Sequence, residues 1–339
     1  MTNQDEQKPM GPGSVSIAMC TYNAERFVLE QLESFLRQTV LPSELVIQDD
    51  HSTDRTLEVV EAFSAKAPFP VLVERNPERL GPTGNFERSM GRCRGDIISL
   101  SDADDVWYPQ RIETAAALMA DRRVGCVFSD ADLGNEDGSL RGMTLWGSIG
   151  FEPAEQDAFA AGDFTDALFR RTIGFGGTMT IRRAVVRAAL PIPRPWGHDN
   201  WTAVIATALF DVRVLRRSLM MYRQHGTQYS GAGGRGLLHK VREAKKAKPA
   251  RDWVPRGCSF DELAIRLGKL RDAAADPSRL DKVRTHAIAK AEHQQMREQL
   301  PEQLLRRVRP VLRDVLRSRY GRYSNGLLSA LRDLAAGRY

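Results

Sequence analysis

Three carboxylates stand within four residues in the segment 101–107, which reads SDADDVW. The segment follows a short apolar run, 96–100, of the kind that forms a buried strand. Crowded carboxylates repel one another, so the cluster needs a positive partner, most simply a divalent metal ion. Mg²⁺ and Mn²⁺ are typically held by one or two carboxylates together with substrate phosphates. A metal–diphosphate site is favoured over a solvated acidic turn, because a tryptophan and a proline follow at once.

A second stretch that could carry chemistry is 195–201, PWGHDNW, where Asp199 stands at the start of a predicted helix, 201–209. The simpler interpretation of Asp199 is an N-cap, which stabilises a helix by about 1 kcal/mol. The functional interpretation is a general base that takes a proton from an attacking hydroxyl. One side chain can serve both roles.

Two further stretches contain residues suited to a ligand. In YRQHG, residues 222–226, His225 could complete a metal shell, or His225 and Arg223 could neutralise a departing diphosphate. A satisfied surface loop is the alternative. The run 173–181 is rich in glycine and leads into a strand, so a ligand could approach its backbone closely. A kinked strand explains that run equally well.

Strand-like and helix-like segments alternate through the N-terminal part of the chain. This alternation predicts an α/β domain with a mostly parallel central sheet flanked by helices. Ligands of such sheets bind outside the carboxyl ends of the strands. No GxGxxG follows the first strand and no GxxxxGK[ST] occurs, which disfavours a Rossmann dinucleotide site and a P-loop. The expected strands are 15–20, 44–48, 70–74 and 96–100, and polar clusters end three of them at Thr21–Asn23, Asp49–Asp50 and Asp102–Asp105.

Three motifs together resemble the signatures of family 2 glycosyltransferases with the GT-A fold. They are IAMCTYN at 17–23, QDDHSTD at 48–54 and SDADD at 101–105, and the resemblance covers about residues 14–232. It implies that a nucleotide-sugar donor lies across the strand ends. The pair His198–Asp199 is similar to the family's motif whose aspartate is the base, so the resemblance makes Asp199 the expected base.

The resemblance also implies roles for the other polar residues. Thr21, Tyr22 and Asp50 would hold the base of the nucleotide, and Asp102 or Asp104 the ribose. The last aspartates of the cluster would bind Mg²⁺ or Mn²⁺ bridging the diphosphate, and Trp201 would pack or stack on an acceptor. The full expected set is Asp199 as catalytic base; Thr21, Tyr22, Asn23, Asp50, Asn85, Asp102, Asp104 and Arg223 for the donor; Gly177, Thr178, His198 and Trp201 on the acceptor side; and Asp104, Asp105 and His225 for the metal.

The combination of SDADDVW, HD followed by a tryptophan, and YRQHG resembles the rhamnosyltransferase-like branch of the family. In that branch an asparagine commonly stands where this chain has Gln228. The resemblance makes dTDP-rhamnose the first expected donor. We expect a metal-dependent inverting transferase that moves a hexose to a hydroxyl of a glycan, lipid-linked or natural-product acceptor. The alternative is a non-catalytic nucleotide-sugar or glycan-binding module with a docking tail.

The charge of the chain is unevenly distributed. Residues 236–339 contain 24 lysines and arginines against 12 acids, whereas the whole chain has 49 against 43. An acidic front and a basic tail indicate two units with different surroundings. We expect a disordered tail at 1–13, a catalytic domain at 14–232 and a basic helical region at 233–339.

The tail contains four amphipathic segments that read as helices, with leucines and valines at helical spacing and arginines between them. They could pack on themselves or on a second subunit, or lie on an anionic membrane surface where lipid-linked acceptors reside. Nucleic-acid binding is disfavoured because the basic residues lack interleaved aromatics. The segments are 260–274, 278–299, 301–319 and 326–336.

No apolar run approaches the length of a membrane span, and residues 1–13 lack the apolar core of a signal peptide. The four cysteines are scattered, without metal or disulfide spacing. We therefore expect a cytoplasmic protein, either free or peripheral on the inner face of the cell membrane.

Overall fold

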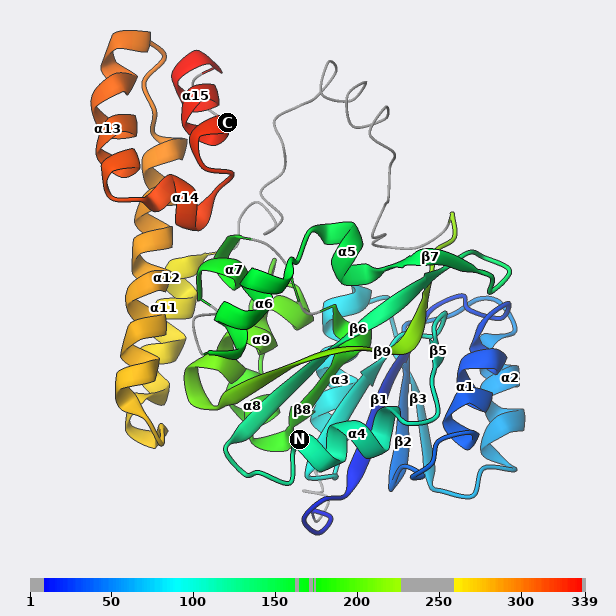
Figure 1. Cartoon of the computed structure of the whole chain (residues 1–339). Helices are drawn as coiled ribbons and strands as arrows, with labels where there is room; N and C mark the ends of the chain where they lie inside the picture. Colours follow the sequence, from blue (N-terminus) through cyan, green and yellow to red (C-terminus); the bar gives the residue numbers. More distant parts are fainter. Residues whose placement is uncertain (1–8, 162–164, 171–172, 174, 227–258, 337–339) are drawn as a thin grey trace.

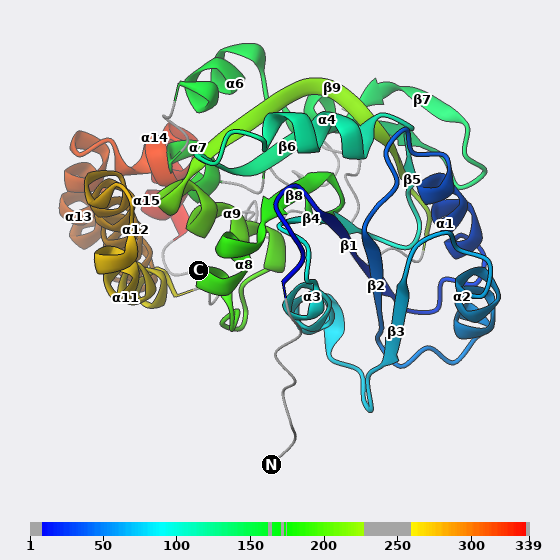
Figure 2. The same ribbon diagram turned by 90° about the horizontal axis from the view of Figure 1, so that it is seen from below.

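The structure is a computed structural model, and it describes residues 9–161, 165–170, 173, 175–226 and 259–336. One curled sheet forms its centre, and helices cover both faces of the sheet (Figures 1 and 2). The strand order is β3-β2-β1-β4-β8-β6-β9-β5, and β7 pairs with β6 outside this path.

The first half of the sheet is parallel. β1 pairs with β2 and β4, and β2 pairs with β3, with no break in register. Every residue of β1, β2 and β4 is buried, as expected of strands covered on both faces. The elements are β1 (Val15–Thr21), α1 (Val28–Leu36), β2 (Glu44–Asp49), α2 (Thr56–Ser64), β3 (Val71–Arg75), α3 (Gly81–Arg92) and β4 (Ile97–Ser101).

The second half is mixed. β8 is antiparallel to both β4 and β6, β9 runs parallel to β6, and β5 adds antiparallel to the end of β9. Its elements are β5 (Val106–Trp107), α4 (Arg111–Leu118), β6 (Val124–Gly134), β7 (Leu140–Thr144), η1 (Gly176–Thr178), β8 (Met179–Arg182), α8 (Arg183–Ala189), α9 (His198–Leu209) and β9 (Asp211–Arg223).

The segment 143–159 has no clear period in the sequence, and we expected a variable loop there over the acceptor side. The structure corrects this: the segment contains two short helices, α5 (Leu145–Ile149) and α6 (Pro153–Ala160), which pack closely. Phe151 lies edge-on to Trp146 and Phe159 at ring distances of 5.2 and 6.1 Å, and all three rings are buried. The period was hidden because each helix is too short to repeat it. A further short helix, α7 (Thr165–Arg170), follows.

The C-terminal helices divide into two groups. α11 (Phe260–Leu270) and α12 (Pro277–Glu298) place Phe260, Leu263 and Val283 in the main hydrophobic core. Beyond them, α13 (Leu304–Leu316), α14 (Arg319–Tyr323) and α15 (Leu327–Ala336) enclose a separate small cluster around Leu300 and Val311. The boundary we expected at 232–233 lies outside the described residues, as do residues 1–8 of the expected tail.

A buried polar network holds the second group together. The ring of His293 on α12 contacts Asp314 Oδ2 at 2.8 Å and Ser324 Oγ at 3.0 Å. Burial lowers the pKa of His293, which favours the neutral ring, and a neutral ring can donate to Asp314 from Nδ1 and accept from Ser324 at Nε2. Arg297 Nε donates to Asp333 Oδ2 at 2.8 Å. The network ties α12 to α13, α14 and α15, and it leaves the outer faces of α13 and α15 uncovered.

The cysteines of the sheet are sealed in the core. Cys20, Cys93 and Cys126 are buried free thiols, and burial raises the pKa of each. In the described part of the chain, no helix has the length and apolar character needed to cross a membrane.

Candidate active site

The acidic cluster forms a turn, residues 102–105, between the end of β4 and the two-residue strand β5. Below the turn lies Gln31 of α1, which is fully buried. With its amide oxygen facing Ser101 Oγ and Trp107 Nε1, its nitrogen donates to the Asp105 carbonyl at 2.8 Å and to Ser34 Oγ at 3.0 Å. One buried amide therefore satisfies both ends of the turn and fixes its backbone.

Two carboxylates of the turn converge on a glycine. A Cβ atom added at Gly177 of η1 would lie 2.8 Å from Asp105 Oδ2 and 3.0 Å from Asp102 Oδ2. Asp105 is 1% exposed, and its Oδ2 receives no hydrogen bond within the described residues. Gly177 thus lets the backbone approach two carboxylates of the chain itself, whereas the approach of a ligand that we expected at this glycine-rich run stays a prediction.

The crowding perturbs both acids. Burial, followed by the charges of Asp104 and Asp199, raises the pKa of Asp102 to about 7. Burial, followed by the charges of Asp104 and Asp102, raises the pKa of Asp105 well above its usual range. A buried carboxylate and a partly buried one that resist ionisation when no cation is near are compatible with a metal site, since a bound cation reverses the penalty.

A buried arginine lies behind the turn. Arg111, at the first position of α4, is 1% exposed and its guanidinium stands 4.1 Å from the centre of the Trp107 ring. Its Nη2 donates to the Gly177 carbonyl at 2.6 Å. Its charge lowers the pKa of Asp102 and Asp105, and burial lowers its own pKa to about 9. Arg111 therefore joins η1 to the acid turn and offsets part of its negative charge.

Arg223 closes the other side of the turn from the end of β9. Its backbone N donates to Asp105 Oδ1 at 3.2 Å and its Nε to the Asp104 carbonyl at 2.8 Å. Its Nη1 donates to the Glu136 carbonyl at 2.8 Å, and its Nη2 pairs with Glu30. We expected Arg223 to meet a diphosphate. Here its guanidinium is 2% exposed and holds protein groups, so it organises the turn.

His225 lies next to the turn, as expected from YRQHG. Its Nε2 contacts Asp104 Oδ2 at 2.9 Å, and its ring lies 4.6 Å from that of Phe27. Within the described residues, no group of three or more His, Cys, Asp or Glu side chains is preassembled around one point. The pair Asp104–His225 and the pair Asp102–Asp105 nevertheless fit Mg²⁺ or Mn²⁺, because such ions take few protein ligands and complete their shells with phosphate and water.

Asp199 stands at the start of α9. It belongs to the first turn of the helix, and the N-cap is Gly197, so the capping interpretation is wrong. Its Oδ1 accepts from the Asn200 backbone N at 2.8 Å, whereas its Oδ2 receives no hydrogen bond in the described part of the chain. Its charge raises the pKa of Asp102, which places the two acids within electrostatic reach. A partly buried carboxylate with one open oxygen is suited to accept a proton.

The neighbours of Asp199 form its support. The His198 ring stacks on Phe86 at 4.0 Å, and burial lowers the pKa of His198. A Cβ atom at Gly176 would lie 2.3 Å from His198 Nε2, so this glycine too is required by close approach. Trp201 is fully buried, and its Nε1 donates to the Ala189 carbonyl at 2.7 Å. Of the two roles we gave Trp201, packing holds and acceptor stacking does not.

The ends of β1 and β2 form the other half of the edge. Thr21 Oγ1 donates to Asp49 Oδ2 at 2.8 Å. Asp50 is 3% exposed, and its Oδ1 and Oδ2 accept from the backbone N of Leu80 at 2.7 Å and of Gly81 at 2.8 Å. Asp50 therefore fixes the start of α3.

Two more expected donor residues differ in exposure. Asn85 is buried, and its Nδ2 donates to the Gln48 carbonyl at 2.9 Å, so it ties α3 to β2. Tyr22 is 40% exposed, with the Arg79 guanidinium 4.0 Å from its ring centre. Asn23 adopts a left-handed conformation with φ of 46°, and its Oδ1 accepts from Thr53 N at 2.8 Å. Tyr22 is therefore the member of this half that offers a flat surface to a ligand.

A family model described as glycosyl transferase family 2 matches residues 16–185, half of the chain. The match includes β4 and β5, which flank the acid turn, and ends before β9. The chain belongs to glycosyl transferase family 2. EpsE of Bacillus subtilis is 30% identical over 139 residues, 41% of this chain and 50% of EpsE. The dTDP-rhamnosyl transferase RfbG of Shigella flexneri is 33% identical over 116 residues, 33% of this chain and 40% of RfbG. This family 2 chain thus spans half or less of the length of these two curated relatives.

Among solved structures, TarS 1–349 of S. aureus in complex with UDP-GlcNAc superposes with a TM-score of 0.58. The sequence identity is 15%, and the match covers 96% of this chain and 93% of TarS 1–349. At this identity the likeness shows a shared fold, and it confirms the expected GT-A-like α/β sheet with helices on both faces. The match extends over the C-terminal helices of this family 2 member as well.

Sequence reasoning missed Arg111 and Gln31. Arg111 does carry a signal, because a positive side chain at the first position of a helix opposes the helix dipole. An arginine at such an unfavourable position is expected to have another role, and here its charge offsets that of the carboxylates in the turn. Gln31 gives no such signal, since a glutamine within a helix is ordinary.

Proposed function

We propose that this chain transfers a sugar from a nucleotide diphosphate sugar to an acceptor hydroxyl, with inversion at the anomeric carbon. The observation that carries the proposal is the orphaned, buried Asp105 Oδ2, which converges with Asp102 on the bare backbone of Gly177. Such a pair suits a cation that grips a diphosphate. Membership of glycosyl transferase family 2 supports the reaction class, and TarS, which shares the fold, binds UDP-GlcNAc.

Asp199 is the proposed base. Its open Oδ2 takes the proton from the acceptor hydroxyl while the acceptor oxygen forms a bond to the anomeric carbon. The bond from that carbon to the diphosphate oxygen breaks, and its electron pair leaves with the nucleoside diphosphate. Attack occurs opposite the leaving group, so the configuration inverts. His198, stacked on Phe86, holds the start of α9 in place.

Asp104, Asp105 and His225 would hold Mg²⁺ or Mn²⁺, with Asp102 beside them. When bound, the ion supplies positive charge to the diphosphate. Arg111 and Arg223 keep the acid turn in shape and do not need to reach the donor for this role.

The nucleotide base would lie at the edge formed by Thr21, Tyr22, Asn23 and Asp50, with Tyr22 and its Arg79 partner as a stacking surface. The name of RfbG, a dTDP-rhamnosyl transferase, supports dTDP-rhamnose as the first donor to test. Gly177 and His198 would then stand on the acceptor side, while Thr178, 2% exposed with its Oγ1 donating to the Phe175 carbonyl at 2.9 Å, would support them from within the protein.

The test is a thermal-shift panel of dTDP-rhamnose, UDP-sugars and GDP-mannose with Mn²⁺, followed by transfer assays with and without EDTA. A true donor at about one hundred times its Kd adds about 2.7 kcal/mol to the free energy of unfolding. Asp105→Asn should abolish the Mn²⁺-dependent part of the shift. Asp199→Asn should keep the shift and lose at least about a hundredfold in turnover, since it retains shape and loses the proton acceptor.

These variants also separate the enzyme from a non-catalytic binding module. A module would show the donor shift in both the wild type and Asp199→Asn, with no turnover in either. Turnover by Asp199→Asn equal to that of the wild type would exclude Asp199 as the base, and activity unaffected by EDTA would exclude the metal.

A further inference from the structure

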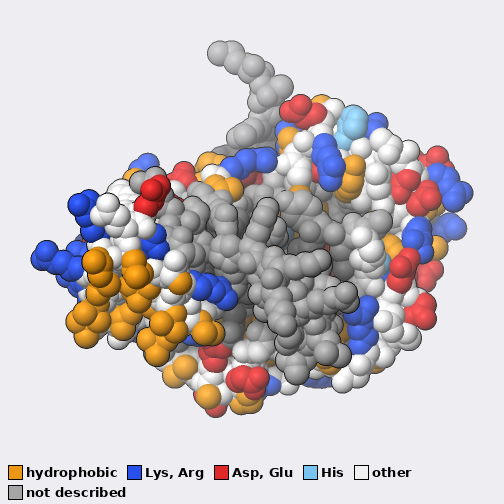
Figure 3. Space-filling view, turned by 90° about the horizontal axis from the view of Figure 1, so that it is seen from above, with side chains coloured by type: hydrophobic (Ala, Val, Ile, Leu, Met, Phe, Trp, Pro, Cys, Tyr) orange, Lys and Arg blue, Asp and Glu red, His pale blue; other side chains and the backbone are white. Residues whose placement is uncertain are grey.

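The outer surface of α13 and α15 carries an apolar patch. Leu305 and Leu316 are 86% and 77% exposed, and neighbouring leucines and a valine are more than two-fifths exposed. Figure 3 shows them gathered on one face of the molecule. Monomeric proteins rarely leave a continuous patch of this kind uncovered. The apolar patch consists of Leu304, Leu305, Val308, Leu312 and Leu316 of α13 and Leu327, Leu328 and Leu331 of α15.

The patch does not result from a helix that lacks a packing partner. The opposite side of α13 is buried through Arg307, Val311 and Asp314, and α15 packs beside it. Arg307 Nη1 donates to the Leu334 carbonyl of α15 at 2.9 Å. The two helices therefore already pack against each other through their buried faces. The exposed leucines, at i, i+4 spacing, are not needed for that packing.

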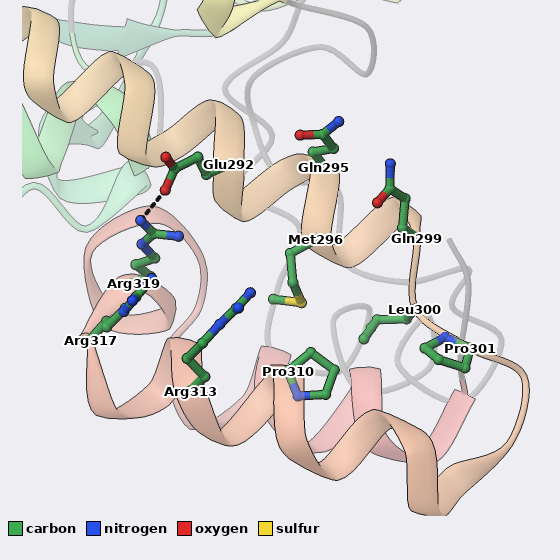
Figure 4. Close-up of a pocket in the computed structure, with 10 residues that line it drawn as sticks. All are labelled: Glu292, Gln295, Met296, Gln299, Leu300, Pro301, Pro310, Arg313, Arg317 and Arg319. Carbon is green, nitrogen blue, oxygen red and sulfur yellow. Dashed lines mark hydrogen bonds and ion pairs between the residues drawn. The ribbon is translucent and has the colours of Figure 1, made fainter.

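Within residues 304–336 the exposed charge has one sign. Arg306, Arg309, Arg313 and Arg317, the arginine stripe, are all exposed and follow the apolar residues around α13. Between residues 304 and 336 the only acids are Asp314 and Asp333, and both are fully buried. The described surface of this unit is thus apolar and cationic. Arg313, Arg317 and Arg319 also line a cavity of about 510 Å³ between α13 and α12 (Figure 4).

We propose that the apolar patch and the arginine stripe dock on a bilayer of anionic phospholipid. A helix with an arginine-rich face beside a leucine face lies in the plane of a membrane, with its leucines among the acyl chains and its cations at the headgroups. Each arginine near an anionic surface strengthens binding by about fivefold. A bilayer matches both halves of this surface, the apolar and the cationic.

Two other occupants fit less well. A second copy would bring the same patch against itself, because the commonest dimers are two-fold symmetric, and the arginine stripes would then meet without exposed acids between them. The segment 227–258 of this chain contains eight lysines and arginines against two acids, so its charge has the same sign as the stripe.

The orientation of the patch relates it to the site. β1 runs upward in Figure 1 toward the edge where the acid turn lies, and α13 and α15 lie at the upper side too. Docking would therefore turn the carboxyl edge of the sheet toward the bilayer. An acceptor hydroxyl displayed on a lipid would then face Asp199, which extends the proposed function without being required by it.

The test is sedimentation of the full chain with vesicles of phosphatidylglycerol and phosphatidylcholine, compared with phosphatidylcholine alone. The wild type should sediment with the anionic vesicles, and added salt should weaken binding. Leu305→Glu with Leu316→Glu should lower the partition coefficient at least about tenfold, because two buried leucines are lost to a charged surface. Arg306→Gln, Arg309→Gln and Arg317→Gln together should lower it by a similar factor.

Matched controls separate the patch from general effects. Ile265→Glu changes an exposed apolar residue of α11, 59% exposed and outside the patch. Arg37→Gln, Arg122→Gln and Arg187→Gln remove the same charge elsewhere. Both controls should bind like the wild type, and all variants should keep the wild-type melting temperature.

Three results would overturn the proposal. One is no binding to anionic vesicles above that to phosphatidylcholine. Another is that the patch variants and the controls lose binding to anionic vesicles equally. The third is a dimer in light scattering that dissociates on Leu305→Glu with Leu316→Glu, which would assign the patch to a second copy. Donor binding is measured separately, so a failure here leaves the proposed function untouched.

Discussion

Asp102 is partly buried near two acids and an arginine, and its ionisation has a measurable cost. Its pKa is raised from 3.8 to about 7 in the folded chain, mainly by burial. A group with a raised folded pKa contributes stability at low pH, and this contribution is lost as the pH rises through the folded value. The metal-free site therefore destabilises the fold most above pH 7.

Asp102→Asn should relieve this cost, because it keeps the shape and removes the charge. Between pH 5 and pH 8, the free energy of unfolding of the variant minus that of the metal-free wild type should grow by about 2 to 3 kcal/mol. Denaturant unfolding at both values measures it. Asp121→Asn is the control, since an ion pair with Arg123 lowers the pKa of Asp121 to about 2. A difference that does not change with pH would contradict the account.

At this scale the sequence predicted which residues lie near the acid turn and left their contacts open. The acids follow β4 and His225 contacts Asp104, while the roles given to these residues and to Asp199 stay predictions. Whether Trp201 faces a ligand or the core depends on α8, whose Ala189 carbonyl accepts its indole hydrogen. No local pattern carries that information.

Among the elements, η1 has the closest approach to the acids. Gly177→Ala should cost Mn²⁺ and donor affinity about tenfold or more, since a Cβ atom 2.8 Å from Asp105 Oδ2 displaces the carboxylates by several tenths of an ångström. Gly177 does not have a positive φ, so backbone strain plays no part. Gly321→Ala, whose added Cβ meets nothing within 4 Å, is the control. Calorimetric titration with Mn²⁺ measures both, and equal affinities would show that the approach is not needed.

Helices and strands could be predicted where a short local stretch of sequence is enough to determine them. The strands expected at 15–20, 44–48, 70–74 and 96–100 differ from β1–β4 by one residue at their ends. Each is an apolar run closed by polar residues. β5 and β7 could not be predicted, because they exist through pairing with β9 and β6. From the sequence we expected a helix at 85–93; α3 begins earlier, at Gly81, because Asp50 accepts hydrogen bonds from the backbone there.

For the whole molecule, the C-terminal helices are expected to differ in importance. Ending the chain at residue 258 removes Phe260 and Leu263 from the main core, along with Arg266, whose Nη1 donates to the Ala189 carbonyl at 3.2 Å. That chain should lose its cooperative melting transition. Ending the chain at residue 302 removes most of the small cluster and only Tyr323 from the main core, so it should melt within several degrees of the full chain and bind donor. Thermal melting followed by circular dichroism measures both shortened chains. If both lose the cooperative transition, the C-terminal helices form one unit.

The buried thiols of the sheet have a practical consequence for measuring membrane binding by fluorescence. Only the thiolate reacts quickly with maleimides, and Cys20, Cys93 and Cys126 are both hidden and held protonated. With Cys258 replaced by serine, a cysteine at position 316 would take up a fluorescent dye selectively. The emission of that dye, blue-shifted in hydrocarbon, would then report binding to the membrane and dissociation from it in real time.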